Sequence, residues 1–367
     1  MFVLGIETSC DETGASVVKD GKDVISNTVA SSLDFHRRYG GVVPEIATRY
    51  HLEVIDYVVK DSLGSAGITL KDLDLVAVTQ GPGLVGSLLV GISFAKSLAY
   101  SLDIPIVGVN HLWAHIYSGL IGCPKIKFPF MGLVVSGGHT SLVLCEDIGK
   151  FRLLGQTRDD AIGEAFDKVA KILGLGYPGG PSIEKAALRG DPDAVKFTSP
   201  YLGDDSYDFS FSGIKTAVLY YVRDRRLTAG MTADIAASFQ KAAIGAIVER
   251  SISACGKRSR ESGTKGPGQS ERLPRTGPDE ILRISQGIDR LIVGGGVSAN
   301  RLLRKELAGA GVANGIEVTF PPMRLSLDNG AMIASTGYLL YKKGKVLFEK
   351  KGKRSDLTLT ARPDLGI

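Results

Sequence analysis

The sequence contains the same order of predicted elements twice, and this duplication limits the chain to a small set of folds. In each copy an apolar strand runs into a β-hairpin, helices follow, and a further apolar strand ends in a glycine-rich loop. The first copy begins at residues 2–7 and reaches its loop at 80–87; the second begins at 132–146 and reaches its loop at 294–300. Sequence identity between the copies is weak. A repeat of this kind predicts two related halves, each of mixed α/β structure.

Apolar periodicity and turn residues place the individual elements. Asp20-Gly21 has the composition of a tight hairpin turn, which separates two strands of the first half. The predicted strands cover 2–7, 15–19, 24–30, 73–79, 104–109, 290–293 and 316–320, with a further hairpin at 132–146, and the predicted helices cover 45–63, 88–102, 162–173, 182–188, 213–225, 232–254, 299–308 and 328–341.

Length and composition indicate a two-domain enzyme. A chain of 367 residues exceeds the size at which one hydrophobic core usually stops growing. The N-terminus begins directly as a strand, without the basic region and cleavage site of a signal peptide. We expect no apolar run long enough to cross a bilayer, and therefore no membrane contact. The four cysteines form no CxxC pair, which predicts free thiols. Together these features predict a cytoplasmic protein.

The net charge of +5 is concentrated in two basic clusters, at residues 257–275 and 342–354. Such clusters attract a polyanion such as RNA, but a solvated loop and a solvated tail have the same composition. The first cluster lies in a hydrophilic stretch at about 256–285 that is rich in Gly, Ser and Pro. With few apolar residues to bury, this stretch is predicted to be a disordered insertion.

Two of the five histidines, His111 and His115, stand four residues apart just after a predicted strand. On a helix this spacing projects both imidazoles from one face, which is a common beginning of a metal site. The spacing resembles the zinc-protease motif, but Leu112 stands where that motif needs a glutamate. Two histidines alone do not make a site, so surface or capping histidines remain the alternative.

Three glycine-rich turns favour nucleotide binding. Residues 136–140 form the turn of a hairpin, where consecutive backbone N–H groups can surround an anion. Residues 294–300 join a strand to a helix, whose N-terminus can meet a ligand. Residues 176–181 form a turn with a proline on either side of its glycine pair. Neither a P-loop nor a Rossmann fingerprint is present, which argues against those two nucleotide folds.

Carboxylates gather at the turn after the first strand, where Glu7, Asp11 and Glu12 follow one another. Three carboxylates this close repel one another unless a cation or a substrate proton is present. Asp11 is a candidate general base, and a solvated acidic turn is the alternative. Asp328 precedes a predicted helix, and its own sequence context predicts a helix N-cap.

Six motifs in order resemble one family, the tRNA threonylcarbamoyladenosine transferases, formerly called O-sialoglycoprotein endopeptidases. Residues 36–45 are most similar to the bacterial branch, and the resemblance covers the chain except for about 256–285, for which bacterial relatives lack an obvious equivalent. The six motifs are GIETSCDET at 5–13, GPG at 81–83, NHLWAH at 110–115, VSGGHT at 135–140, GYPGGP at 176–181 and GGGVSAN at 294–300.

The resemblance implies an actin-like ATPase fold of the actin, Hsp70 and sugar-kinase type (ASKHA), with two related lobes around a nucleotide cleft. We expect an N-terminal lobe of residues 1–110 plus 326–367 and a second lobe of residues 111–325. The family implies Asp328 as a third metal ligand beside His111 and His115, with Fe(II) and Zn(II) equally suited. It implies Asp11 in catalysis and a substrate site lined by Val134, Val135, Ser136, Gly137, Gly138, Asp167, Gly180, Glu184 and Asn300.

The implied reaction transfers the threonylcarbamoyl group of threonylcarbamoyl-AMP to N6 of adenosine 37, in tRNAs that read codons beginning with A. The family also implies an inactive paralogue that dimerises with the enzyme, a small ATPase, and the enzyme that makes the adenylate. One rival is an actin-fold ATPase or phosphotransferase, although Glu7 and Ser136 stand where such enzymes usually carry aspartates. A metalloprotease is a second rival, which Leu112 disfavours because a glutamate is needed at that position. An inactive nucleotide-binding scaffold is a third, which the presence of His111, His115 and Asp328 disfavours.

Overall fold

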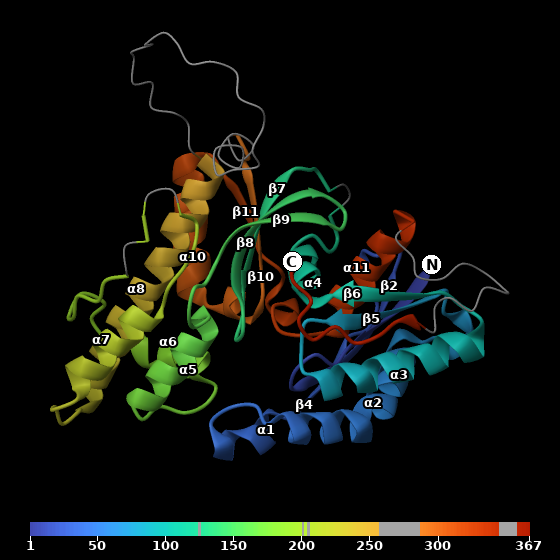
Figure 1. Cartoon of the computed structure of the whole chain (residues 1–367), viewed down its shortest axis with the longest axis horizontal. Coiled ribbons are helices and arrows are strands. Elements are labelled where there is room, and N and C mark those ends of the chain that lie inside the picture. Colours follow the sequence, from blue (N-terminus) through green and yellow to red (C-terminus); the bar gives the residue numbers. More distant parts are fainter. Residues whose placement is uncertain (124–125, 200–201, 204–205, 257–286, 345–357) are drawn as a thin grey trace, which may run out of the picture.

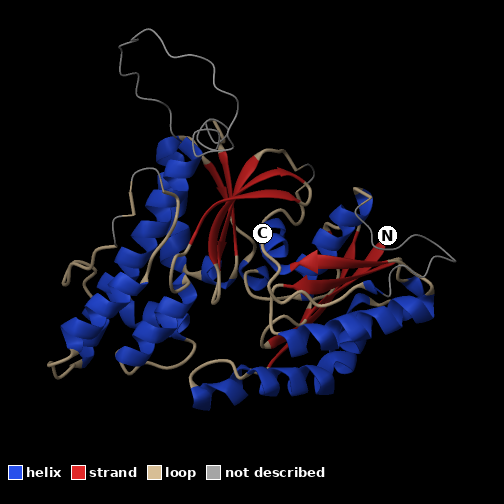
Figure 2. Ribbon diagram, in the orientation of Figure 1, coloured by secondary structure: helices blue, strands red, loops and turns tan. Residues whose placement is uncertain are grey.

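The computed structural model describes the chain except residues 124–125, 200–201, 204–205, 257–286 and 345–357. Two mixed β-sheets lie side by side, each with helices packed on it (Figures 1 and 2). We call each sheet with its helices a lobe. The predicted insertion at 256–285, apart from Gly256, and most of the basic cluster at 342–354 lie outside the described residues.

The first sheet is built around β1, whose two neighbours run in opposite directions. The central strand pairs antiparallel with β2 and parallel with β5. The strand order is β3-β2-β1-β5-β6, and β4 pairs with β2 outside this path. These strands are β1 (Phe2–Glu7), β2 (Glu12–Lys19), β3 (Asp23–Val24), β4 (Thr28–Ser31), β5 (Leu75–Gly81) and β6 (Ile106–Asn110).

The second sheet repeats this topology. Its order, read from the hairpin edge, is β9-β8-β7-β10-β11, and β7 pairs antiparallel with β8 and parallel with β10. The duplication expected from the sequence is therefore confirmed. These strands are β7 (Phe130–Val135), β8 (Thr140–Asp147), β9 (Lys150–Gln156), β10 (Arg290–Gly294) and β11 (Glu317–Thr319). The sequence patterns missed β9, which is only partly buried and lacks a strong apolar alternation.

Helices cover both faces of the first sheet. On one face α2 and α3 bury alternate residues of β1 and β5, including Leu4, Ile6 and Val76. On the other face α11 and α4 pack against the intervening residues, such as Val3 and Ala77. The helical elements of this lobe are α1 (Leu33–His36), η1 (Arg37–Tyr39), α2 (Pro44–Ala66), η2 (Leu70–Asp72), α3 (Val85–Leu102) and α11 (Gly330–Lys342).

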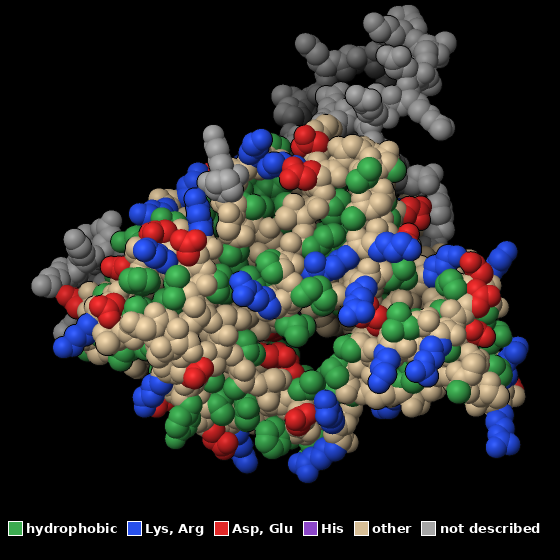
Figure 3. Space-filling view, turned by 180° about the vertical axis from the view of Figure 1, so that it is seen from behind, with side chains coloured by type: hydrophobic (Ala, Val, Ile, Leu, Met, Phe, Trp, Pro, Cys, Tyr) green, Lys and Arg blue, Asp and Glu red, His purple; other side chains and the backbone are tan. Residues whose placement is uncertain are grey.

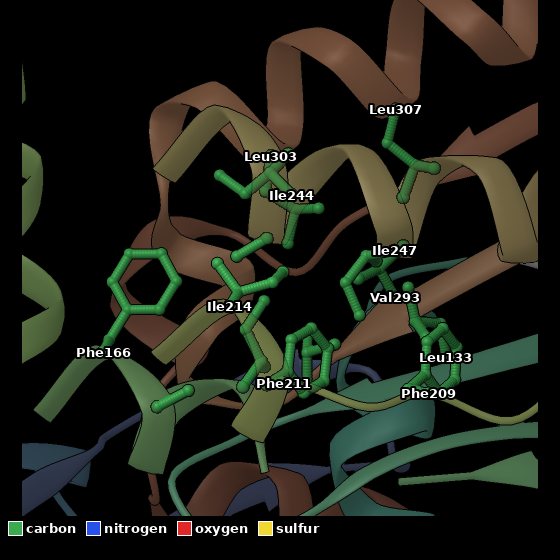
Figure 4. Packing of buried hydrophobic residues seen from close by; sticks show 14 of the residues in the cluster. Leu133, Phe166, Phe209, Phe211, Ile214, Ile244, Ile247, Val293, Leu303 and Leu307 are labelled. Atoms are coloured by element: carbon green, nitrogen blue, oxygen red, sulfur yellow. The ribbon is translucent and has the colours of Figure 1, made fainter. Parts of the chain in front are cut away.

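A large core fills the second lobe between its sheet and five helices. Figure 4 shows Phe166 of α5, Ile214 of α7 and Leu303 of α10 converging with Leu133 and Val293 of the sheet. The predicted helix at 299–308 is split into η3 and α10. The helical elements of this lobe are α5 (Ile162–Ile172), α6 (Gly179–Ala187), α7 (Ser212–Val222), α8 (Ala229–Gly256), η3 (Gly296–Ala299), α10 (Arg301–Asn314) and η4 (Met323–Leu325).

Helix α4 (His111–Ser118) lies where the two lobes meet. Its residues Leu112, Ile116 and Tyr117 pack against Val134 and Ile292. These two residues lie on the free face of the second sheet, by which we mean the face opposite the large core. The opposite side of α4 contacts α11, which packs on the first sheet. Any side chain that α4 presents between these contacts is thus held relative to both lobes.

Helix α3 corrects one expectation from the sequence. By length and composition alone, Val85–Leu102 is apolar enough to cross a membrane. In the fold one face of this helix packs on the first sheet, where Leu88, Ile92 and Ala95 are buried, while Leu89 and Tyr100 on its other side are exposed. The apolar run that we expected not to exist is therefore present, and it serves packing.

We expect Gly5→Ala to lower the free energy of unfolding by about 3 kcal/mol, because overpacked backbone contacts cannot relax easily. A Cβ on Gly5 of β1 would clash with the carbonyl oxygen of Gly330 and the backbone nitrogen of Ala334 on α11. Chemical denaturation measures the loss. Gly64→Ala is the control, because a Cβ on that exposed residue of α2 meets nothing within 4 Å. Equal stability of the two variants would contradict the role assigned to this contact.

Candidate metal centre and adjoining cleft

His111 and His115 lie on the first two turns of α4, facing the junction between the lobes. Asn110 begins the helix, since its side-chain oxygen accepts hydrogen bonds from the backbone N–H groups of Leu112 and Trp113 at 2.9 and 3.2 Å. His111 is 8% exposed and His115 is fully buried. The alternative of surface or capping histidines is therefore wrong. The Nε2 atoms of the two imidazoles are 3.1 Å apart.

Asp328 reaches the same point from the segment that leads into α11. Its Oδ1 lies 3.0 Å from Nε2 of His115 and 3.6 Å from Nε2 of His111. The sequence context had predicted a helix N-cap at Asp328, and this is wrong. The cap is Asn329, whose side-chain oxygen accepts a hydrogen bond from the backbone N–H of Met332. Asp328 is thereby free to face the histidines.

The three ligand atoms fit a divalent transition metal. Two donor atoms that each lie about 2.1 Å from one ion are roughly 3.0–3.4 Å apart at tetrahedral or octahedral angles. The separations between His111, His115 and Asp328 are close to this range. Two imidazoles and one carboxylate leave coordination positions open, which is typical of catalytic rather than structural sites.

Glu7 stands behind His111 and fixes the orientation of its ring. Its Oε2 lies 2.9 Å from Nδ1 of His111, and the same oxygen accepts a hydrogen bond from the hydroxyl of Thr79. A carboxylate on the distal nitrogen leaves Nε2 for a metal and makes the imidazole a stronger ligand. The sequence had marked Glu7 only as one of three acidic residues. This contact was missed because Glu7 and His111 are far apart in the sequence and are brought together by the order of the strands.

The electrostatic environment favours positive charge at this point. Burial lowers the pKa of His111, but Glu7 and Asp328 outweigh it and raise the pKa to about 9. Burial likewise raises the pKa of Asp328, and the nearby imidazoles reverse the effect and lower it to about 2. A site that stabilises a protonated imidazole beside a carboxylate stabilises a bound cation for the same reason.

The hairpin turn at 136–140 lies next to this centre. His139, in that turn, has a pKa lowered to about 4 by burial and then by the charges of His111 and His115. Gly137 and Gly138 are exposed, and a Cβ on either would meet nothing within 4 Å. Their backbone N–H groups are accessible to an anion. Val134 and Val135 are fully buried in β7, backbone included, and lead into the exposed turn.

The glycine-rich turn after β10 has a different explanation. A Cβ on Gly294 would clash with the carbonyl oxygen of His115, and one on Gly295 would clash with that of Val135. Gly295 also has a φ of 94°, which favours glycine. These glycines let the backbones of β10, α4 and β7 approach closely, beside the candidate ligand His115.

The remaining candidates of the second lobe lie around the N-termini of two helices. Asp167 accepts a hydrogen bond from the backbone N–H of Gly179 at 2.6 Å, at the start of α6. Glu184 accepts one from the backbone N–H of Arg301 at 2.8 Å, and Asn300 caps α10 through the N–H of Leu303. Gly180 is half-buried, with open space where a Cβ would stand. The structure thus brings α5, α6 and α10 together through these residues.

Asp11 approaches this group from the first lobe. Burial raises the pKa of Asp167, and Asp11 contributes to the rise across the gap. The sequence singled out no role for Tyr177, whose pKa is raised by burial and then by Asp167 and Asp11. Figure 3 shows the surface hollowed between the lobes, with acidic side chains at the edge of the hollow.

Two neighbours of Asp11 are unsuited to act as charged groups. Burial, Asp328 and Asp11, in that order, raise the pKa of Glu12 well above its usual value. The acidic turn is therefore electrostatically crowded, as its composition predicted. Burial and the same carboxylates raise the pKa of the Cys10 thiol, which makes it a poor nucleophile.

We expect Glu7→Gln to weaken Zn(II) binding by about 10- to 100-fold, because the substitution removes the charge behind His111 and keeps the side-chain shape. Competition with a chromophoric chelator measures the affinity. Asp20→Asn, on an exposed turn of the same sheet, is the matched control and should bind as the wild type does. If both variants bind equally, Glu7 does not tune the centre.

Comparison with known proteins shows to which family the chain belongs. The family model for tRNA N6-adenosine threonylcarbamoyltransferase (TsaD) matches residues 23–335. A protein of that name from Symbiobacterium thermophilum is 49% identical over 367 residues, covering 100% of this chain and 97% of the relative. Another, from Clostridium perfringens, is 46% identical over 368 residues, covering 100% of this chain and 98% of the relative.

The fold has solved counterparts with little sequence identity. Full-length HypF in its phosphate- and nucleotide-bound form aligns with a TM-score of 0.57 and 14% identity, covering 93% of this chain and 55% of that chain. The expected actin-like fold is thereby confirmed. With a family match over most of its length and relatives of one name along all of it, the chain belongs to the tRNA N6-adenosine threonylcarbamoyltransferase family.

Proposed function

We propose that this transferase moves the threonylcarbamoyl group of threonylcarbamoyl-AMP to N6 of adenosine 37, in tRNAs that read codons beginning with A. One observation carries the proposal beyond family membership. The ligand atoms of His111, His115 and Asp328 converge beside an exposed glycine hairpin and an acidic turn of the opposite lobe. An anion-binding turn and an ionisable carboxylate near one metal centre suit transfer from an acyl phosphate to an amine.

The adenylate would lie in the second lobe. The N–H groups of Gly137 and Gly138 would bind its phosphate, with Ser136 and the backbone of Val134 and Val135 beside them. Asp167, Gly180, Glu184 and Asn300 would face the adenosine, since the structure brings them together at the N-termini of α6 and α10.

The metal would be Fe(II) or Zn(II), which the two-histidine, one-carboxylate set accommodates equally. When bound, it would supply Lewis acidity that polarises the threonylcarbamoyl carbonyl. The protein's part is to hold the ligand atoms in place, and Glu7 does so for His111.

Asp11 would accept a proton from the exocyclic amine of adenosine. The N6 lone pair is delocalised into the purine ring, so the amine is a weak nucleophile without a base. In the transfer, the bond from N6 to the carbonyl carbon forms and the bond from that carbon to the phosphate oxygen breaks. AMP leaves with the electron pair of the broken bond, and the proton of N6 passes to the carboxylate.

We expect Asp11→Ala to reduce single-turnover transfer by about 100- to 10,000-fold, because a positioned general base contributes that much. Adenylate affinity should stay nearly unchanged, since Asp11 lies on the lobe opposite the hairpin. Nucleoside mass spectrometry of unmodified tRNA incubated with enzyme, threonylcarbamoyl-AMP and the bacterial partner proteins measures the product. His111→Ala should also abolish it, and Asp23→Ala, on the exposed strand β3, should not. Full activity of Asp11→Ala would remove the base from the mechanism.

The rival of an actin-fold ATPase or phosphotransferase is not favoured. Such an enzyme needs a free carboxylate near the end of the first strand to work with Mg-ATP. Here Glu7 is buried and already bonded to His111, Thr79 and the backbone N–H of Ser9. Phosphate release from ATP without product at adenosine 37 would support the ATPase instead. A protein that binds no metal and has neither activity would support the nucleotide-binding scaffold.

Partners belong to the same proposal: tRNA, a paralogue that dimerises with the enzyme, a small ATPase, and the enzyme that makes the adenylate, all in the cytoplasm. An apolar groove between α2 and α3 suits the dimerising partner. It has a volume of about 540 Å³ and is lined by Leu52, Ile55, Leu89, Val90 and Phe94 with three polar residues. Leu52 is 64% and Leu89 50% exposed, and an apolar surface of this kind usually binds another protein.

We expect Leu52→Glu and Leu89→Glu to abolish the complex with the paralogue, because each places a charge in the groove. Size-exclusion chromatography of the mixed proteins measures complex formation. Leu219→Glu is the matched control, since Leu219 is 47% exposed on α7 of the other lobe. Complex formation by all three variants would exclude this groove as the interface.

A further inference from the structure

Residues 358–367, called here the C-terminal strap, connect the first lobe to α4, the helix that carries His111 and His115. The strap runs along the first lobe and ends between the two lobes, at the label C in Figure 1. Its second residue, Leu359, is 2% exposed within the core under α2 and α3. The Nζ of Lys96 on α3 donates to the carbonyl oxygen of Leu359 at 2.7 Å, and the Gln80 amide donates to that of Thr360. This end of the strap is firmly anchored.

The middle of the strap holds the loop that follows β5. The backbone N–H of Arg362 donates to the carbonyl oxygen of Gln80 at 2.8 Å, and that of Gly83 donates to the oxygen of Pro363 at 3.2 Å. A Cβ on Gly81 would clash with the carbonyl oxygen of Arg362. The same loop reaches the acidic turn, because the N–H of Leu84 donates to the oxygen of Ser9.

The end of the strap reaches the residue that starts α4. The side-chain amide of Asn110 donates to the carbonyl oxygen of Gly366 at 2.8 Å, while its oxygen caps the helix. Asn110 is 4% exposed. Ile367 packs in the cluster formed by α4 and the free face of the second sheet, beside Leu112 and Ile116. The strap therefore contacts the first lobe, α4 and the second lobe in succession.

We propose that Asn110 and the strap are positioning elements of the metal centre, which rests on the metal binding proposed above. One amide performs two tasks with two different atoms: Oδ1 orders the first turn of α4, and Nδ2 fixes that turn to the strap. His111 is the next residue and His115 lies one turn further. A rotation of this short helix would move both Nε2 atoms relative to Asp328, which belongs to a different segment. Metal affinity is therefore set partly by residues that touch no ligand atom.

Two substitutions test this inference in the full-length protein. One changes Asn110, which holds the end of the strap, and the other changes Leu359, which anchors its beginning. Asn110→Asp is isosteric and still accepts the helix-capping hydrogen bonds, but it has no donor for Gly366. Leu359→Ala removes the anchor in the core of the first lobe. We expect each to weaken Zn(II) binding by about tenfold in a chelator competition, the lower end of the effect of residues behind metal ligands. The double variant should be less than additive, since both act through one segment. The Co(II) absorption spectrum should shift in both.

Leu63→Ala is the control for general loss of stability. Leu63 is buried in the same core as Leu359, but it belongs to α2 and not to the strap. It should lower the melting temperature as Leu359→Ala does and leave Zn(II) affinity unchanged. Wild-type affinity in both strap variants, or equal weakening in Leu63→Ala, would overturn the inference. Failure of the wild-type protein to bind Zn(II) and Co(II) would overturn the proposed metal centre together with it.

Discussion

The candidate centre depends on close backbone contact between α11 and the first sheet. Gly5 of β1 faces Gly330, and a Cβ on Gly330 would lie 2.5 Å from the backbone nitrogen of Ser16 on β2. Because α11 begins within two residues of Asp328, this contact determines how far the Asp328 carboxylate lies from the first sheet. The histidines are placed in the same way, since Gly294 allows β10 to lie against the carbonyl oxygen of His115. The positions of the candidate metal-ligand atoms therefore depend on backbone packing on two sides of α4.

The sequence predicted the fold well where signals are local or repeated. The duplicated strand and hairpin pattern predicted two sheets of equal topology, and most elements began within a few residues of their expected positions. The i,i+4 spacing predicted that His111 and His115 share one helix face, and the structure places both on α4, whose N-cap is Asn110. The lobe boundaries of 1–110 plus 326–367 and 111–325 remain a prediction. Helix α4, at that boundary, packs on both lobes.

No local sequence pattern predicted that Asp328 and Glu7 lie beside the histidines, because both are far from them in the sequence. Asp328 is more than 200 residues from the histidines, and its local pattern favoured a helix cap, which Asn329 provides instead. Family resemblance supplied Asp328 as a ligand, because no periodicity could. Glu7 and His111 come together only because β1, β5 and β6 are neighbours in the sheet, so that the ends of β1 and β6 lie close to each other. Partners of this kind are determined by strand order, which a single sequence specifies only indirectly.

Six glycines of the second lobe separate into two groups, and the distinction bears on where a substrate can bind. Gly179, Gly294 and Gly295 have no room for a Cβ because protein backbone occupies that space. Gly137, Gly138 and Gly180 have open space at the same position. Open space alone does not mark a binding site, since Gly64 of α2 has it too, but at these three positions it leaves room for a ligand to reach the backbone. These three glycines lie on the second lobe, on the hairpin and at the start of α6, across from Asp11. A ligand that used this space and also reached the Asp11 carboxylate would lie between the two lobes.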